Sequence, residues 1–275
     1  MNNDKKEFLA EKARQIRVDA VKAVHAAKSG HPGGALSIAD ILAYLYFDEM
    51  NVDPKDPKKA DRDRLVLSKG HACPALYAAL SEKGFFPKDV LWTFRKYGSI
   101  LQGHPDMKHI PGVDMSTGSL GQGVSAACGM ALSGKISGEK YRVYAILGDG
   151  EIEEGQVWEA AMFAHHYSLD NLTIFVDFNG LQVDGTVEEV IDPAPIDEKF
   201  KAFGWNVVVI DGHDLEQIES AVKCAKATKD RPTAIIAKTV KGKGVSYMEN
   251  AVGWHGKAPN DEEFAVAMKE LGEKA

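Results

Sequence analysis

Short runs of apolar residues recur along the chain, and longer segments with helical periodicity separate them. Short apolar runs bounded by turn residues indicate buried strands. Their alternation with helical segments is typical of βαβ units that form a parallel sheet. We therefore predict an α/β fold with a doubly wound, mainly parallel sheet flanked by helices. The predicted strands are Leu65–Leu67, Val143–Leu147, Leu172–Val176, Val207–Ile210 and Ala234–Ala237.

The helical segments have recognisable ends and faces. The pattern up to Ser29 predicts one amphipathic helix, stopped by the glycine and proline that follow. The segment Ser37–Tyr46 predicts a second helix with Ser37 as its N-cap. The small and apolar segment Ser119–Leu132 predicts a closely packed helix whose first turn can approach a ligand. A further helix is expected to begin near Glu151, with one face formed by Val157, Trp158, Ala161, Met162 and His165.

The composition narrows the class of protein. A length of 275 residues is near the upper size for one hydrophobic core, so we predict a single domain over residues 1–275. The net charge of −7 argues against nonspecific binding of nucleic acid, and no apolar run is long enough to span a membrane. The N-terminus lacks the apolar segment of a signal peptide. Three scattered cysteines are too few for a disulfide framework or a zinc site, which favours a cytoplasmic protein with reduced thiols.

Candidate chemistry lies at the ends of two predicted strands. Gly148-Asp149-Gly150 follows the second strand, and Asn179 closes the third. Open α/β sheets bind ligands at the carboxyl ends of their strands. Carboxylate and amide oxygens are the hard ligands that magnesium prefers, and the glycines allow the backbone to approach a diphosphate. The pattern favours a metal-held diphosphate, although Gly-Asp-Gly by itself is also an ordinary turn.

The region from Gly148 to Asn179 resembles the thiamine diphosphate motif, which begins with GDG and ends in asparagine. In detail the chain resembles transketolase, from about Arg14 to Gly256. This resemblance implies the diphosphate-binding domain of the thiamine diphosphate-binding fold. It also implies thiamine diphosphate as cofactor, with Mg²⁺, or Ca²⁺ or Mn²⁺ in its place. The other segments that carry it are KSGHPGG, RLVLSKGHA, GHP, STGSLGQG and GWHG.

The resemblance also implies roles for individual residues. Asp149 and Asn179 would be side-chain metal ligands, and Leu181 would contribute its main-chain oxygen. Val183 would pack beneath the thiazolium ring, although a core valine is the alternative. Ser119 stands where the family often has proline. The residues implied in cofactor binding are His71, Gly118, Ser119, Leu120, Gly150, Glu154, Asn179 and Val183.

Five of the nine histidines lie beside a glycine. A neutral imidazole can donate or accept a hydrogen bond, so it suits sugar hydroxyls and proton transfer. The resemblance implies that His31, His104 and His255 are catalytic and surround the oxygens of the donor sugar, whereas His71 lies near the diphosphate. His213 falls outside the matched segments, and we predict a loop residue there.

Two pairs of charged residues near the motifs have more than one interpretation. Glu154 and Glu159 suit the solvated start of a helix, where carboxylates are favoured. The resemblance instead implies a subunit interface near the cofactor for both. Lys241 and Lys243 lie in a glycine-rich stretch and could meet a sugar phosphate, but a flexible surface loop is the simpler prediction.

The resemblance covers only the first of the three domains that transketolases normally carry. The pyrimidine-binding and C-terminal domains are absent, so we predict the N-terminal subunit of a split transketolase. With a partner chain it would transfer a two-carbon ketol unit from a ketose phosphate to an aldose phosphate. Two copies of each chain are expected, since symmetric assembly is usual. The alternatives are a subunit similar to deoxyxylulose-phosphate synthase and a non-catalytic regulatory protein that binds thiamine diphosphate; the set of histidines argues against the latter.

Overall fold

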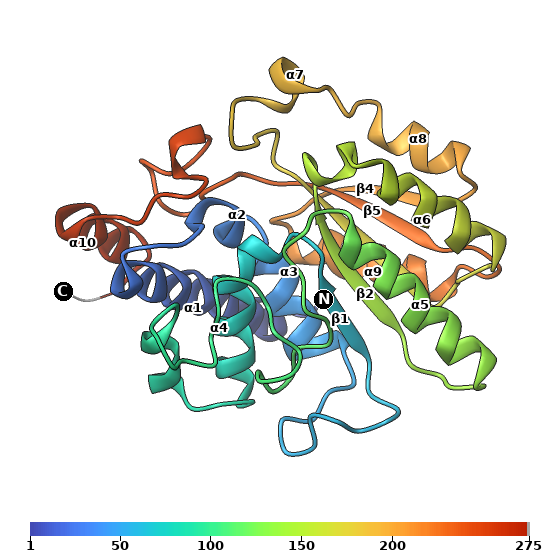
Figure 1. The fold of residues 1–275 in the computed structure, drawn as a ribbon, viewed down its shortest axis with the longest axis horizontal. Helices are drawn as coiled ribbons and strands as arrows, with labels where there is room; N and C mark the ends of the chain where they lie inside the picture. Colours follow the sequence, from blue (N-terminus) through green and yellow to red (C-terminus); the bar gives the residue numbers. More distant parts are fainter. Residues whose placement is uncertain (274–275) are drawn as a thin grey trace.

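The computed structural model describes residues 1–273 and contains a five-stranded parallel sheet (Figure 1). The spatial order of its strands is β1-β2-β3-β5-β4, and every neighbouring pair is parallel. Each predicted strand is present, extended by one or two residues, and the predicted parallel α/β fold is confirmed. The strands are β1 (Arg64–Leu67), β2 (Val143–Gly148), β3 (Leu172–Phe178), β4 (Asn206–Asp211) and β5 (Thr233–Lys238).

Helices cover both faces of the sheet. The longer helices are α1 (Asn3–Ala27), α4 (Cys73–Lys83), α5 (Gln122–Ile136), α6 (Gly155–His166), α9 (Leu215–Ala227) and α10 (Asp261–Glu270). The shorter ones are α2 (Pro32–Leu36), α3 (Ala39–Tyr44), α7 (Val187–Val190) and α8 (Ile196–Ala202). A π-helical turn spans Leu45–Glu49, and short 3₁₀ turns span Gly70–Ala72, Lys88–Thr93, Glu151–Glu153 and Val252–Trp254.

Alternate residues of each strand enter different cores. In β2, Tyr144 and Ile146 pack into the core formed with α1, α3, α4 and α9. Val143, Ala145 and Leu147 pack into the core formed with α5, α6 and α8. Because both faces of the sheet are buried, the strand ends remain as the place where the sheet can present polar groups to a ligand.

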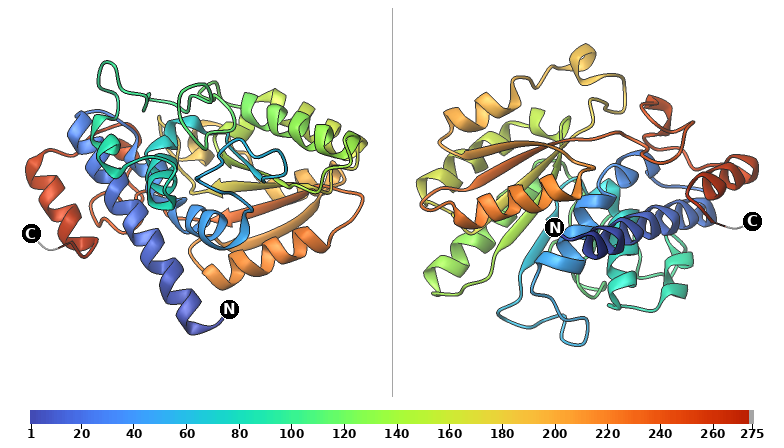
Figure 2. Two further views of the ribbon diagram at one scale, coloured as in Figure 1. Left: turned by 90° about the horizontal axis from the view of Figure 1, so that it is seen from below. Right: turned by 180° about the vertical axis from the view of Figure 1, so that it is seen from behind.

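A third, smaller core attaches the C-terminal region to the N-terminal helices. Figure 2 shows α10 beside α1, and Val21 of α1 packs in one cluster with Ala267 of α10. The same cluster includes Val245 and Trp254, from the segment that follows β5. That segment is therefore anchored to α1 and α2 over the end of the sheet. None of the helices in residues 1–273 combines the length and the apolar character needed to cross a membrane.

The prediction of one helix over Ser37–Tyr46 was wrong. Helix α2 ends at Leu36 and α3 begins at Ala39, so Ser37 is the C-cap of α2 and not an N-cap. Its main-chain N–H donates to the Gly33 carbonyl, and its hydroxyl donates to Asp177 Oδ2 at 2.8 Å. The Ser37 hydroxyl therefore donates to the buried carboxylate of Asp177, on a strand distant in the sequence, instead of capping a helix.

The other predicted helices are present with adjusted details. The first helix ends at Ala27, where Lys28 adopts a left-handed conformation with φ of 51°. The predicted face of α6 was partly wrong, because Met162 and His165 are exposed. Small side chains allow α6 to pack closely against α5, and the larger ones face outward. The buried residues of α6 are Val157, Ala160, Ala161 and Ala164.

Candidate cofactor-binding site

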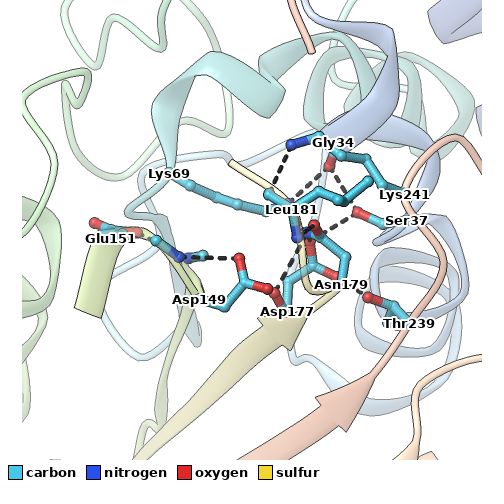
Figure 3. Close-up of polar contacts among 12 residues, drawn as sticks. Gly34, Ser37, Lys69, Asp149, Glu151, Asp177, Asn179, Leu181, Thr239 and Lys241 are labelled. Atoms are coloured by element: carbon cyan, nitrogen blue, oxygen red, sulfur yellow. Dashed lines mark hydrogen bonds and ion pairs between the residues drawn. The ribbon is translucent and has the colours of Figure 1, made fainter. Parts of the chain in front are cut away.

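A cavity of about 140 Å³ lies where β1, β2 and β3 end. The close-up in Figure 3 shows the polar contacts around it. Strand register explains the assembly, because Gly148 at the end of β2 pairs with Asp177 at the end of β3. Residues that the sequence analysis singled out and that line this cavity are His71, Leu120, Asp149, Gly150, Asn179, Leu181, Val183, Lys241 and His255.

Asp149 is fixed by main-chain groups from both sides of the cavity. Its Oδ1 accepts the N–H of Gly150 at 2.9 Å, and its Oδ2 accepts the N–H of Gly180 at 2.6 Å. The side chain is almost completely buried, and this burial, with the nearby charge of Asp177, raises its pKa to about 6. The N–H of Gly150, which the resemblance assigns to the cofactor diphosphate, donates to Asp149 in this structure.

Asn179 is oriented by the acidic residue that precedes it by two positions. Its Nδ2 donates to Asp177 Oδ2 at 2.7 Å, and its Oδ1 accepts the N–H of Leu181 at 3.2 Å. A carboxylate only accepts hydrogen bonds, so the amide nitrogen must face Asp177. The amide oxygen is thereby turned toward Leu181 and away from Asp177.

Asp177 is the centre of this polar network, and the sequence analysis missed it. The residue is fully buried, and Lys69 Nζ donates to its Oδ2 at 2.6 Å. Burial by itself would raise the pKa of Asp177, but the charge of Lys69 and the hydrogen bonds hold the pKa below its usual value. Ser37 and Thr239 also donate to this carboxylate. Four separate segments of the chain therefore meet at one side chain (Figure 3).

Lys241 is buried, so the prediction of a flexible surface loop was wrong for this residue. Its Nζ donates to the main-chain oxygen of Leu181 at 2.8 Å and to Nδ1 of His255 at 2.9 Å. Burial lowers its pKa to about 8. The small core around Trp254 holds this segment over the strand ends and excludes solvent from the lysine. Lys243, two residues later, is 39% exposed and lies beside Glu249.

Four histidines lie together beside the cavity. The ring centroids are separated by 5.3 Å for His31 and His71, 5.1 Å for His71 and His255, and 5.5 Å for His31 and His255. His104 lies 6.5 Å from His31. Burial is the main cause that lowers the pKa of each, to about 4 for His31 and about 3 for His255. The four imidazoles are therefore neutral near pH 7 and can donate or accept hydrogen bonds.

Arg95 supports this histidine group, and the sequence analysis did not identify it. Its NH1 donates to the Ser29 hydroxyl at 2.6 Å, and its NH2 lies 3.4 Å from His31 Nδ1. Arg95 is in the left-handed region with φ of 58°, a conformation that no sequence motif indicated. The hydroxyl of Tyr77 fixes the neighbouring loop by donating to the His104 carbonyl at 2.9 Å.

Another buried acid, Glu151, closes the turn after β2. Its carboxylate accepts the N–H groups of Gly148 at 3.0 Å and Gly121 at 2.9 Å, and it also accepts the Ser68 hydroxyl. Burial raises its pKa. The residue joins the ends of β1 and β2 to the start of α5.

Several predicted site residues lie outside the cavity lining. Ser119 and Glu154 are exposed, and Glu159 is exposed on α6. Gly118, with φ of 148°, lies against the ring of His104, where an added Cβ would come within 3.1 Å. Val183 is 59% exposed at the cavity, so the alternative of a core valine was wrong.

The oxygen donors at this site fit a hard divalent cation. Within residues 1–273, no three histidine, cysteine or acidic side chains are grouped as metal ligands. A metal would therefore draw on one carboxylate, one amide oxygen and a main-chain carbonyl, from Asp149, Asn179 and Leu181. These groups line one cavity, and Mg²⁺ typically takes only one or two protein carboxylates beside ligand phosphates.

A parallel sheet with a fixed carboxylate and amide at adjacent strand ends is typical of an α/β domain that binds a ligand at this edge. Comparison with known families identifies the family to which this domain belongs. The sequence model described as "Transketolase, thiamine diphosphate binding domain" matches residues 9–275, and the chain belongs to this family.

Two bacterial relatives match nearly the whole chain and are themselves of similar length. The chain is 46% identical to the "6-deoxy-6-sulfo-D-fructose transketolase subunit SqwG" of Clostridium sp. (strain MSTE9), over 96% of each chain. It is 42% identical to one of the subunits of the apulose-4-phosphate transketolase of Phocaeicola vulgatus, over 98% of this chain and 95% of that one. The chain is thus a transketolase-type enzyme subunit with a thiamine diphosphate-binding domain.

Longer relatives match the same domain. The human "Transketolase" is 44% identical over 93% of this chain and 41% of its own length. The crystal structure of transketolase from Campylobacter jejuni superposes with a TM-score of 0.93 at 34% identity, covering all of this chain and 44% of that one. The chain therefore spans less than half the length of these relatives.

Proposed function

We propose that the chain holds the diphosphate end of thiamine diphosphate through a divalent metal, with Mg²⁺ as the preferred ion and Ca²⁺ or Mn²⁺ as substitutes. Asp149 and the Oδ1 of Asn179 would bind the metal with the main-chain oxygen of Leu181. The observation that carries this proposal is that all three line one cavity at the ends of adjacent strands. Main-chain N–H groups already hold Asp149 in place, which lowers the entropy lost on binding.

Lys241 supplies the positive charge for the diphosphate. Its ammonium lies in the cavity wall, next to Leu181 and His255. Attraction between opposite charges is strong where water is excluded, and a diphosphate carries several negative charges. His71 lies on the same side of the cavity and can donate a further hydrogen bond.

Thiamine diphosphate, when bound, supplies the nucleophilic carbon and the electron sink for cleavage of a carbon–carbon bond. The chain's own histidines handle the oxygens of the sugar. Burial keeps His31 and His255 neutral near pH 7. The Nδ1 of each ring accepts from a cationic side chain, so Nε2 carries the proton and can donate a hydrogen bond to a hydroxyl or carbonyl oxygen of the sugar. His104 lies within the same group and would hold a further hydroxyl. Arg95 orients His31 for this role.

A second chain completes the active site in this proposal. The cavity of about 140 Å³ is smaller than the 300–1,000 Å³ of typical ligand pockets, which supports a half-site. Leu120 and Val183 present partly exposed apolar side chains at the cavity, where a cofactor ring and a partner can cover them. The partner would carry the pyrimidine-binding and C-terminal domains, with two copies of each chain in the assembly. The names of both bacterial relatives, which describe subunits, support this arrangement.

The reaction we propose is transfer of a two-carbon ketol unit from a ketose with an anionic end to an aldose phosphate. The ordinary pentose phosphates belong to this substrate class. The relatives named for a sulfo sugar and for apulose 4-phosphate support a wider range of donors. A reducing, cytoplasmic location is also part of the proposal, supported by the buried free thiols of Cys73 and Cys128.

The test is calorimetric titration of the chain with thiamine diphosphate and Mg²⁺, followed by ketol-transfer assays with and without the partner chain. We expect Mg²⁺-dependent binding, no transfer by the chain alone, and transfer after the partner is added. Transfer by the chain alone would contradict the split active site. Release of CO₂ from pyruvate by the two-chain complex would instead indicate a synthase of the deoxyxylulose-phosphate type. Cofactor binding without either activity would indicate a regulatory protein.

A further inference from the structure

His213 connects a buried ion pair to the segment that carries Lys241. It lies in the loop between β4 and α9, and its side chain is only 15% exposed. Its Nδ1 lies 2.8 Å from Asp40 Oδ2, and its Nε2 accepts the main-chain N–H of Val240 at 2.9 Å. The predicted loop position was correct, but both ring nitrogens of this loop residue are engaged with other segments.

The ion pair fixes which nitrogen of His213 carries the proton. Arg17 of α1 donates to both carboxylate oxygens of Asp40 on α3, and it also donates to the Leu36 carbonyl at 3.2 Å. Burial by itself would raise the pKa of Asp40, but Arg17 and His213 hold it below its usual value. Asp40 is therefore an acceptor, and the Nδ1–H of His213 donates to it. The Nε2 of the neutral ring is left as the acceptor for Val240.

The main chain around Lys241 is held at three points. The N–H of Val240 donates to His213, the Lys241 carbonyl accepts the N–H of Asn250 at 3.0 Å, and the N–H of Gly242 donates to the Gly33 carbonyl at 3.0 Å. Two of these anchors join main-chain groups. Of these three anchors, the side chain of His213 is the one nearest β5 along the chain, just after Thr239, whose N–H donates to the Phe178 carbonyl at 3.1 Å.

We propose that His213 is a positioning residue, which holds Val240 so that the ammonium of Lys241 lies in the cofactor cavity. The inference rests on the proposed function, because it takes cofactor binding as the property that Lys241 serves. A chain of contacts from Arg17 through Asp40 and His213 transmits the rigidity of the helices α1 and α3 to the cavity wall. His213 itself does not line the cavity, so its effect on the cofactor passes through Lys241.

Two substitutions separate the two ring nitrogens. His213→Gln places a carbonyl oxygen at the distance of Nε2, where it can still accept the N–H of Val240. His213→Asn is shorter and keeps a polar group only near Asp40. His109→Asn is the matched control, because His109 is an exposed histidine paired with Asp106 at 2.6 Å, away from the cavity.

The experiment measures binding of thiamine diphosphate with Mg²⁺ to the complex of this chain and its partner by isothermal titration calorimetry. Loss of one hydrogen bond predicts that His213→Asn weakens binding about tenfold. We expect His213→Gln to remain within about threefold of wild type and His109→Asn to be unchanged. In ketol-transfer assays the weakening should appear in the KM for cofactor, with kcat at saturating cofactor within about twofold.

A double-mutant cycle with Lys241→Met tests whether the effect of His213 on cofactor binding passes through Lys241. If His213 acts through Lys241, His213→Asn should weaken binding by less than about twofold when Lys241 is already replaced. Thermal unfolding of each variant shows whether it is folded. Should His213→Asn not fold, Asp40→Asn takes its place in the cycle with the same expectation, because it removes the charge that fixes the ring.

Three results would overturn the inference. One is equal cofactor affinity of the asparagine variant and wild type. Another is a glutamine variant as weak as the asparagine variant. The last is an effect of His213→Asn on binding that is as large in the Lys241→Met background as in wild type. Absence of cofactor binding by the wild-type complex is a different result, since it would refute the proposed function and the inference with it.

Discussion

Lys69 and Asp177 form an ion pair of 2.6 Å in which both side chains are almost completely excluded from solvent. Lys69 follows β1 and Asp177 lies near the end of β3, so the pair bridges across the intervening strand β2. Both groups have further partners, because Lys69 also donates to the Gly34 carbonyl and Asp177 accepts hydrogen bonds from Ser37, Thr239 and Asn179. The pair therefore holds together the buried polar network beside the cavity.

Replacing Lys69 by methionine should lower the free energy of unfolding by about 3–5 kcal/mol, because it leaves a buried charge without its partner. The measurement is urea unfolding followed by circular dichroism. Lys201→Met is the control, since Lys201 is 56% exposed and pairs with Asp197 at 2.8 Å. The control should change the free energy of unfolding by less than about 1 kcal/mol. Equal effects of the two substitutions would show that burial of the pair contributes nothing to the free energy of unfolding.

Two glycines of α5 allow a matched test of close packing. An added Cβ at Gly123 would lie 2.7 Å from Ser68 Cα, whereas a Cβ at Gly129 would meet nothing within 4 Å. Both residues lie in α5, Gly123 in its first turn and Gly129 in its interior, where alanine gains the full helix propensity. We expect Gly129→Ala to stabilise the isolated chain by about 0.5–1 kcal/mol. Gly123→Ala should destabilise it by about 1–3 kcal/mol, because the backbone at Ser68 must move to make room for the added methyl group. Thermal unfolding of both variants measures the difference, and stabilisation by Gly123→Ala would contradict it.

Asp149→Asn should separate cofactor binding from stability. The substitution removes a carboxylate that we propose as a metal ligand, so Mg²⁺-dependent binding of thiamine diphosphate should weaken by at least about 100-fold. The free energy of unfolding should fall by no more than about 1–3 kcal/mol, because the amide nitrogen then faces one of the two main-chain N–H groups that the carboxylate accepted, while removal of a buried charge offsets part of this cost. Calorimetric titration and urea unfolding on the same preparation measure both quantities. Unchanged binding would refute the metal role of Asp149.

The buried histidines predict how stability depends on pH. Burial lowers the pKa of His31 from 6.5 to about 4 and that of His255 from 6.5 to about 3. The unfolded chain therefore binds more protons than the folded chain below pH 6.5. The histidine contribution should destabilise the fold progressively as pH falls from about 6.5 toward 4, and it should be constant above pH 7.5. Urea unfolding from pH 8 to pH 5 measures this trend.

His31→Asn provides the matched variant for this pH experiment, because it removes one of the titrating groups. Its free energy of unfolding should fall less steeply between pH 6.5 and 5 than that of wild type. A wild-type slope in His31→Asn would show that the pH dependence comes from other groups.

The parallel sheet could be predicted because its strands are local apolar runs whose ends carry turn residues. The cluster of His31, His71 and His255 could be placed only through the resemblance, since distant loops bring the rings together. Lys241 was misjudged because its burial depends on packing of Trp254 and α10 over its segment, which no local pattern encodes. The role of Asp177 was missed because its partners come from the residues that follow β1, α2 and β5, far apart in the sequence.

The anchoring of Asp149 by the main-chain N–H groups of Gly150 and Gly180 has a consequence for how this enzyme type can diversify. Backbone geometry, and not a set of neighbouring side chains, fixes the carboxylate, so changes of nearby residue identity leave it in place. The histidines and Arg95, in contrast, lie on connecting loops and are held by side chains such as Ser29 and Tyr77. Mutation can therefore reshape the loops that we propose to face the sugar, so that they accept a new substrate, while the proposed cofactor anchor is inherited unchanged.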